Sequence, residues 1–144
     1  MQPRLSLITL GVSDVARSRA FYEQLGFVAS PASQGDVAFF QMNGLALALY
    51  PHAALAEDAR VEDTATGFAG ITLAHNVRSE AEVDALHAQM LAAGARELRA
   101  PGKVFWGGYI SYLADPDGHI WELAHNPFFP LDEAGNLHLP GAGA

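Results

Sequence analysis

The sequence YLADPDGHIWEL, at residues 112–123, places a turn between two apolar runs. Residues 115–118, Asp-Pro-Asp-Gly, are typical of a type I β-turn, with proline at the second position and glycine at the fourth. Because apolar runs flank the turn, strands are predicted at residues 109–113 and 120–124. This stretch therefore predicts a β-hairpin near the end of the chain.

A helix and two further strands are predicted before this hairpin. Ser79-Glu-Ala-Glu82 is a capping box, which marks the start of a helix. A stripe of apolar residues at helical spacing then runs from Val83 to Leu91, and a glycine ends the helix. With strands at residues 70–75 and 95–99, the order is one strand, one helix and three strands.

The first half of the chain repeats this order with little residue identity. Asn43-Gly44 lies between two apolar runs and is the strongest short-range signal for a hairpin. The predicted elements are strands at residues 5–12, 27–29, 36–42 and 45–50, and a helix that begins after Ser13 or Asp14 and runs to Leu25.

The repeat predicts a single α+β domain over residues 1–144. Its expected parts are a βαβββ module at residues 5–50, a linker at 51–66, a second βαβββ module at 67–127 and a tail at 128–144. One sheet with a single helix leaves its other face exposed, so the two modules are expected to form curved mixed sheets around a cleft. The modules close either on each other or on a second chain. The tail is expected to pack Phe128 and Phe129 and then to fray.

The composition excludes several classes of function. The chain has no cysteine, which rules out disulfides, cysteine-ligated zinc and thiol catalysis. Its net charge is −8 with only 8 Lys+Arg, so it has no basic stripe for nucleic acid. No apolar run approaches the roughly 18 residues of a membrane span, and the N-terminal run is too short for a signal peptide. A cytoplasmic protein without a membrane partner is predicted.

Four stretches carry a family resemblance. ITLGVSD at residues 8–14, SRAFYEQLGF at 18–27, GFAGITL at 67–73 and the hairpin at 112–123 resemble the vicinal-oxygen-chelate superfamily. That superfamily holds glyoxalase I, extradiol dioxygenases, methylmalonyl-CoA epimerase and bleomycin- or fosfomycin-resistance proteins. The resemblance implies paired βαβββ modules around a cleft, a small-molecule ligand and a homodimer. It does not imply one activity, because one scaffold hosts many chemistries.

The resemblance also locates the residues that hold a metal ion in metal-dependent members. The four inward-facing positions correspond to Leu7, Ala48, Gly70 and Glu122. Only Glu122 has a side chain that ligates a metal, whereas zinc sites usually need at least three protein ligands and harder ions need several oxygens. The resemblance therefore implies a degenerate metal site, and no cofactor is expected.

The histidines are not expected to build a replacement site. Strand alternation directs His75 away from the cleft if Gly70 faces it. His87 lies beside Leu86 on the second predicted helix and is expected to be solvated. His52 is the one histidine expected to reach the rim of the cleft.

Glu122 allows two interpretations. In the first it is an acceptor or general base for a bound ligand, because a desolvated carboxylate without a partner suits proton transfer. In the second it is a strand carboxylate that is hydrogen-bonded to a neighbour or to water. If Ala114 pairs with His119 across the turn, Ser111 lies opposite Glu122 and is that neighbour.

Aromatic residues supply the other candidates for ligand contact. Two glycines separate Trp106 from Tyr109, which suits a mobile loop or a close backbone approach. These two side chains form either an aromatic wall over a ligand or a plug at a sheet edge or dimer interface. Phe39 and Phe40 are adjacent, so only one of them faces the cleft, and the sequence does not decide which. The candidate ligand-binding residues are Trp106, Tyr109, Ser111, Phe40, Tyr50 and Leu7.

Three functions remain open from the sequence. The first is a small-molecule-binding protein with a degenerate metal site, similar to the bleomycin-resistance branch, that binds an apolar or aromatic ligand. The second is a glyoxalase-like lyase or isomerase, or a dioxygenase, with an atypical metal site. The third is a cofactor-free enzyme that uses Glu122 as its base.

Overall fold

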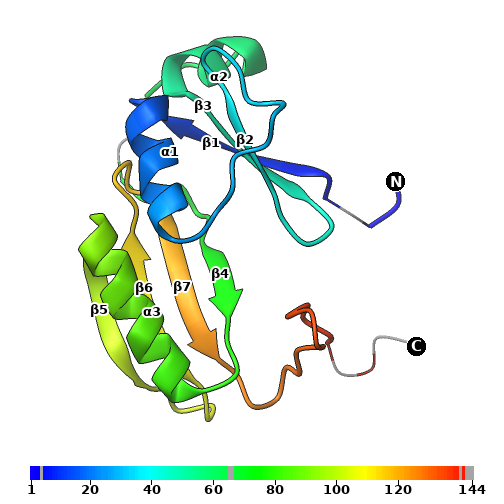
Figure 1. The fold of residues 1–144 in the computed structure, drawn as a ribbon, viewed down its shortest axis with the longest axis vertical. Coiled ribbons are helices and arrows are strands. Elements are labelled where there is room, and N and C mark those ends of the chain that lie inside the picture. Colours follow the sequence, from blue (N-terminus) through cyan, green and yellow to red (C-terminus); the bar gives the residue numbers. More distant parts are fainter. Residues whose placement is uncertain (4, 65–66, 140, 142–144) are drawn as a thin grey trace. The chain divides into compact units, whose positions relative to one another are not determined.

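The protein is an α+β fold with two mixed sheets and three helices in the described residues (Figure 1). The computed structural model describes residues 1–144 except 4, 65–66, 140 and 142–144. Its internal contacts divide the chain into two units, Met1–Ala69 and Gly70–Ala144, and each unit is described by itself. Among the described residues, no helix has the length and apolar character needed to cross a membrane.

The first unit is a three-stranded sheet with two helices. Its elements are β1 (Leu7–Val12), α1 (Val15–Gln24), β2 (Ala38–Gln41), β3 (Ala46–Pro51) and α2 (His52–Ala59). The strand order is β1-β3-β2, in which β1 is parallel and β2 antiparallel to β3. Asp14 is the N-cap of α1, because its carboxylate accepts from the backbone N–H of Arg17 at 3.0 Å.

Two predicted segments of the first unit differ in the structure. The strand expected at residues 27–29 is wrong, since only one bridge between Ala29 and Phe40 forms there. The predicted linker at residues 51–66 contains the eight-residue helix α2, and its last two residues lie outside the described part of the chain.

The second unit is a four-stranded sheet with one helix. Its elements are β4 (Leu73–Asn76), α3 (Glu80–Ala93), β5 (Arg96–Lys103), β6 (Tyr109–Ala114) and β7 (Ile120–His125). The order β4-β7-β6-β5 repeats that of the first unit, where the bridge at Ala29 takes the place of a fourth strand beside β2. The internal repeat predicted from the sequence is therefore confirmed at the level of topology.

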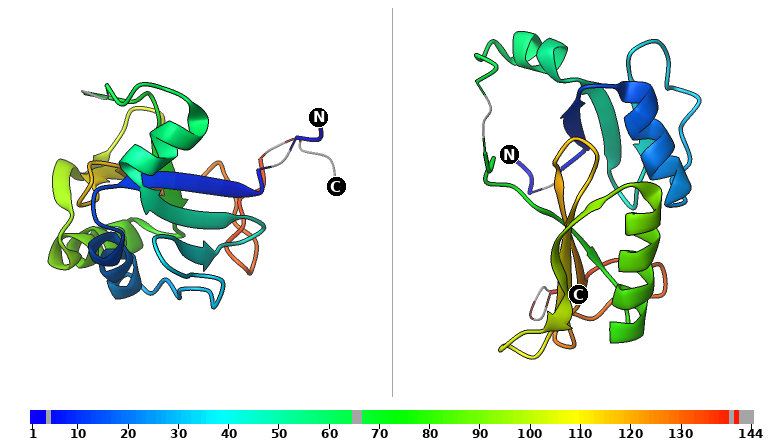
Figure 2. Two further views of the ribbon diagram at one scale, coloured as in Figure 1. Left: turned by 90° about the horizontal axis from the view of Figure 1, so that it is seen from above. Right: turned by 90° about the vertical axis from the view of Figure 1, so that its left-hand side faces the viewer.

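Helix α3 lies along one face of this sheet (Figure 2). Ser79 caps it by accepting from the backbone N–H of Glu82 at 3.2 Å, as the capping box predicts. The buried stripe is Val83, His87 and Met90. The expectation that His87 is solvated is wrong, because β5 runs beside the helix and brings Glu97 Oε2 within 2.7 Å of His87 Nε2. His87 is only 5% exposed.

The turn between β6 and β7 is a type I turn followed by a bulge. Gly118 N–H donates to the carbonyl of Asp115 at 2.9 Å, and Gly118 has a φ of 87°. Asp115 N–H then donates to the carbonyl of His119 at 2.8 Å, so the glycine is an extra residue in the turn. The next pair is Ala114 with Ile120, and the predicted pairing of Ala114 with His119 is wrong by one residue.

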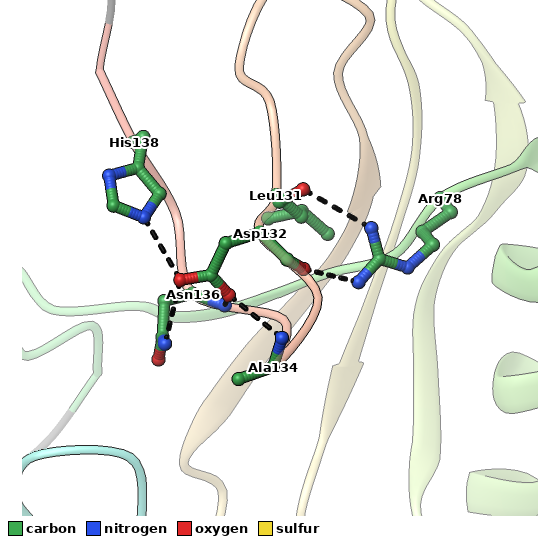
Figure 3. Close-up of polar contacts among 6 residues, drawn as sticks. All are labelled: Arg78, Leu131, Asp132, Ala134, Asn136 and His138. Carbon is green, nitrogen blue, oxygen red and sulfur yellow. Dashed lines mark hydrogen bonds and ion pairs between the residues drawn. The ribbon is translucent and has the colours of Figure 1, made fainter.

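The C-terminal segment forms a closed turn against the second unit (Figure 3). The Asp132 carboxylate accepts from the backbone N–H groups of Ala134 and Asn136 and pairs with His138 at 3.0 Å. These contacts, led by the hydrogen bond from His138, hold the pKa of Asp132 well below its usual value of 3.8. Arg78 donates to the carbonyls of Leu131 and Asp132. The expected fraying after Phe129 is therefore wrong for the described part of the tail.

Candidate ligand-binding face of the second unit

The register of β5, β6 and β7 sorts the side chains of the second sheet onto two faces. The helix-covered face includes Ser111 and Leu113, which are fully buried, and Tyr109, whose hydroxyl donates to Asp84 of α3 at 2.8 Å. Because strand side chains alternate, their neighbours point away from α3. We call that second face the distal face. It carries Ile110, Tyr112 and Ala114 of β6, Ile120, Glu122 and Ala124 of β7, and Ala74 of β4.

Glu122 on the distal face is paired with Tyr112. The two residues are direct partners across β6 and β7, and the Glu122 carboxylate acts on the pKa of the Tyr112 hydroxyl. Burial raises the pKa of Tyr112 above its usual 10.0, the charge and hydrogen bond of Glu122 raise it further, and the charge of Arg99 partly offsets the rise. The neighbour that faces Glu122 is thus a tyrosine, and both interpretations of Glu122 stay predictions.

Replacing Glu122 by glutamine is expected to lower the pKa of Tyr112 toward 10. The substitution removes the negative charge that opposes ionisation of the phenol. In the wild type, the raised pKa keeps the Tyr112 phenol protonated beside Glu122 below pH 10, and the stability that depends on the neutral phenol is lost as the pH rises through the higher folded-state value. NMR titration of the tyrosine ¹³Cζ signals measures the pKa of Tyr112, and the Tyr112→Phe variant assigns its signal. An unchanged pKa in Glu122→Gln would contradict the pairing.

Ser111 and Tyr109 lie on the other face of the sheet from Glu122. Ser111 pairs with Leu123 rather than with Glu122, so the predicted contact between Ser111 and Glu122 is wrong. Its buried hydroxyl has no hydrogen-bond partner among the described residues. The bulge at Gly118 is the physical reason, since a shift of one residue exchanges the two faces of a strand. Tyr112 is the residue that the sequence reasoning missed, and glycine after the type I turn was the available signal.

Trp106 lies in the tight turn between β5 and β6. Val104 N–H donates to the carbonyl of Gly108 at 2.9 Å, which closes the turn. The indole of Trp106 packs directly against Gly108, where a β-carbon would collide with the ring, and the ring of Phe128 lies against Gly107. The close approach predicted for the two glycines is confirmed. Trp106 remains 37% exposed, and its contact with a ligand stays a prediction.

Phe40 belongs to the core of the first unit. Its ring lies 6.2 Å from that of Tyr22 and 5.6 Å from that of Phe27, between the sheet and α1. It is only 1% exposed, so the choice of Phe40 as a ligand-binding residue is not supported. Phe39, its neighbour in β2, points to the opposite face of the sheet together with Ala48, its partner in β3.

Leu7 and Tyr50 share this α1-distal face of the first sheet. Leu7 pairs with Ala46 and is 45% exposed. The phenol of Tyr50 is hydrogen-bonded to Asp58 of α2, and the charge of Asp58 raises its pKa. Their roles in ligand binding stay predictions, as the structure places them on a sheet face but describes no ligand contact.

A hollow of about 540 Å³ lies elsewhere in the first unit, at the N-terminus of α1. Its lining residues come from residues 13–19, residues 33–38 and Pro51. Two of the polar side chains there are engaged within the protein: Asp14 caps α1, and Arg19 pairs with Glu23 at 2.8 Å. The hollow holds none of the residues that the sequence analysis selected.

Comparison with known proteins decides the family. The model of the glyoxalase/bleomycin resistance protein/dioxygenase superfamily matches residues 4–123. The chain belongs to this superfamily. A glyoxalase-related enzyme from Fulvimarina pelagi is 40% identical, with 95% of this chain and 98% of that chain aligned at a TM-score of 0.86.

More distant members share the fold. A superfamily enzyme from Burkholderia phytofirmans PsJN is 22% identical, with coverage of 83% of this chain and 96% of that chain and a TM-score of 0.75. A lactoylglutathione lyase from Agrobacterium tumefaciens is 21% identical, with coverage of 86% and 94% and a TM-score of 0.63. No curated protein matches the chain.

Four positions were assigned to the metal ligands by the resemblance, and the degenerate metal site that they imply stays a prediction. Glu122 is the only carboxylate, and its partner on β4 is Ala74. Gly70 precedes β4 and has a φ of 80°, so it is not a strand residue as predicted. Leu7 and Ala48 offer no side-chain ligand. In the described part of the chain, no three His, Cys, Asp or Glu side chains are grouped as a metal site would require.

His52 is engaged with its own neighbours. Its ring lies against Gly11 of β1, where a β-carbon would come within 2.9 Å of it. Its Nδ1 lies 3.0 Å from Asp63 Oδ2. The histidine predicted at the rim therefore covers the end of the first sheet, and its contact with a ligand stays a prediction.

Proposed function

We propose that this superfamily member binds a small apolar or aromatic molecule and holds no metal for this purpose. The Tyr112–Glu122 pair supports the proposal, because it places a phenol beside a carboxylate on a sheet face that also carries apolar side chains. Ligand sites are commonly mostly apolar with a few polar groups that orient the ligand. The flanking residues on this face are Ile110, Ala114, Ile120 and Ala124.

The polar pair has hydrogen-bonding capacity left for a ligand. A carboxylate offers about four lone-pair directions, so a neighbouring phenol leaves most of them for a ligand. A ligand N–H or O–H group is the natural complement to Glu122. Ile110, Ala114 and Ala124 are already buried, so the half-buried Ile120 is the apolar neighbour that suits a ligand ring, whose burial contributes roughly 25 cal/mol per Å² of apolar area removed from water.

Binding of benzamide is the test of this proposal. Its ring suits the apolar part of the distal face, and its amide N–H groups suit the Glu122 carboxylate. Titration followed by ¹H–¹⁵N NMR is expected to shift the backbone signals of Ala74, Tyr112 and Glu122, with a Kd on the order of 1 mM for so small a ligand. Glu122→Gln is expected to weaken binding roughly tenfold, the effect of losing one charge-assisted hydrogen bond.

Tyr109→Phe is the matched control. It removes a hydroxyl from the same strand, but from the helix-covered face, and is expected to leave benzamide binding unchanged. Absence of shifts at Tyr112 and Glu122, or shifts confined to the helix-covered face, would overturn the proposal.

Metal content distinguishes this proposal from a lyase or dioxygenase with an atypical metal site. Elemental analysis of the purified protein is expected to find well below one equivalent of zinc, manganese, iron or nickel, because one carboxylate does not hold a divalent ion tightly. Dialysis against Zn²⁺ is expected to give the same result for the wild type and Glu122→Gln. A stoichiometric ion that is lost in Glu122→Gln would favour Lewis-acid chemistry instead.

A cofactor-free enzyme that uses Glu122 as its base is the remaining alternative. The same carboxylate supports it, and Glu122→Gln would then abolish turnover and not merely weaken binding. The proposal also includes a cytoplasmic homodimer, for which sedimentation of the purified protein measures the oligomeric state.

A further inference from the structure

Two arginines of β5 share the distal face with Glu122. Arg96 pairs with Ala114 and Arg99 pairs with Tyr112, and both partners point away from α3. In a regular strand, residues three apart face opposite sides. The register shift between Glu97 and Arg99 inserts an extra residue, and so turns both guanidinium groups to one face.

Glu97, one of the two residues between them, supports this assignment. Glu97 pairs with Leu113 on the helix-covered face and binds the buried His87 of α3 at 2.7 Å. The irregular part of β5 thus sends one carboxylate beneath the helix and two arginines to the distal face. The Glu97 carboxylate therefore lies on the opposite face of the sheet from the two arginines.

Neither arginine has a resident anion. Among the described residues, no hydrogen bond or ion pair joins Arg96 or Arg99 to a carboxylate, and both are exposed. Other arginines of the chain are engaged: Arg19 pairs with Glu23, and Arg78 binds two carbonyls. The charge of Arg99 nevertheless acts on the Tyr112 hydroxyl, which places the guanidinium close to the polar pair.

The row across the sheet has opposite charges at its two ends. Arg99, Tyr112 and Glu122 are successive partners on β5, β6 and β7. Adjacent strands lie about 4.8 Å apart, so the backbones at the two ends of this row are separated by about 10 Å. An aromatic ring with an anionic group fits that span, with the ring over Tyr112 and the anion toward β5.

We propose that the ligand is a small organic carboxylate, bound through its carboxylate by Arg99 and Arg96. This inference rests on the proposed function and names its ligand class. The planar guanidinium group matches a carboxylate with two parallel hydrogen bonds, which a neutral ligand does not form. In a chain with a net charge of −8, the two arginines supply the local positive charge that attracts an anion.

Comparison of benzoate with benzamide tests the inference, because the two probes have nearly the same shape and differ in charge. Benzoate is expected to bind about tenfold more tightly in the NMR titration, as expected for a charge-assisted pair. Arg99→Gln is expected to abolish this preference. Arg99→Lys is expected to retain part of it, since the charge remains but the two-pronged geometry is lost.

Lys103→Gln is the matched control for charge. Lys103 lies on the same strand but pairs with Tyr109 on the helix-covered face, so its loss is expected to leave the preference for benzoate intact. Circular dichroism checks that each variant is folded. If Lys103→Gln reduces the preference as much as Arg99→Gln does, a diffuse charge effect explains it and the inference fails.

The remaining outcomes separate this inference from the proposed function. Equal binding of benzoate and benzamide at Tyr112 and Glu122 would overturn the carboxylate class and leave small-molecule binding in place. Binding of neither probe would overturn both. If the signals of this face instead shift with protein concentration in the absence of any probe, the face is an interface between two copies and the inference fails.

Discussion

Replacing Phe40 by alanine is expected to lower the free energy of unfolding by about 3–5 kcal/mol, the usual loss for a buried phenylalanine. The ring is 1% exposed and packs against Tyr22 and Phe27. Those two rings are themselves neighbours, with centroids 5.3 Å apart, so truncation leaves a cavity inside an aromatic cluster that cannot collapse fully. Chemical denaturation followed by circular dichroism measures the change.

Phe39→Ala is the matched control, because it removes the same side chain from the adjacent position. Phe39 is half-buried on the opposite face of the first sheet. Its replacement is expected to cost much less, on the order of 1 kcal/mol, in line with an average substitution. A larger loss for Phe39→Ala than for Phe40→Ala would show that the two faces of β2 are assigned the wrong way round.

Asp115→Ala is expected to destabilise the second unit by about 2–3 kcal/mol. The Asp115 side chain lies in the turn of the β6–β7 hairpin and is buried. Its Oδ1 accepts from the backbone N–H groups of Asp117 and His119 at 2.9 and 2.8 Å. Alanine leaves both donors without this partner, and each unsatisfied buried donor costs about 1–3 kcal/mol. Thermal and denaturant unfolding measure the loss.

Asp115→Asn separates the hydrogen bonds of this side chain from its charge. Asparagine keeps an acceptor oxygen at the same position. Asp115→Asn is therefore expected to retain most of the stability that Asp115→Ala loses. The Tyr112 ¹³Cζ signal reports on the register of the hairpin in the same samples. Equal losses in the two variants would mean that these backbone hydrogen bonds do not explain the role of Asp115.

The β6–β7 hairpin shows which features of the candidate site can be predicted from the sequence and which cannot. Proline and glycine in residues 115–118 predict the turn, and the flanking apolar runs predict both strands. The register depends on whether Gly118 lies within the turn or is an added residue, and the φ of 87° at Gly118 decides it. That single residue exchanges Ser111 for Tyr112 opposite Glu122. The presence of the hairpin was thus predictable, but the partner of Glu122 was not.

Side chains whose place depends on distant segments were less predictable still. Alternation requires Phe39 and Phe40 to face opposite sides, but the choice between the sides depends on Tyr22 of α1 and on Phe27. His87 is polar and beside Leu86, which suggests a solvated helix face, yet Glu97 of β5 makes burial favourable. In both cases the deciding partner is a residue of another element, and the local pattern does not contain it.

The metal positions that the resemblance implies stay predictions, but the structure shows where their residues lie. Glu122 lies on the expected strand and on the face away from α3. Gly70 does not lie on the expected strand, because β4 begins at Leu73. The residue of β4 that pairs with Glu122 is Ala74. The expectation of a degenerate metal site is the same for either residue, because glycine and alanine are equally without a ligating side chain.

The anchor of the C-terminal segment has a consequence for how this part of the chain can vary among relatives. Arg78 recognises main-chain oxygens at positions 131 and 132, so the attachment does not depend on which side chain stands at position 131. Asp132 is different, since its carboxylate shapes the loop that presents those oxygens. A change of side chain at position 131 is therefore expected to leave the attachment in place, as long as Arg78 and Asp132 are both retained.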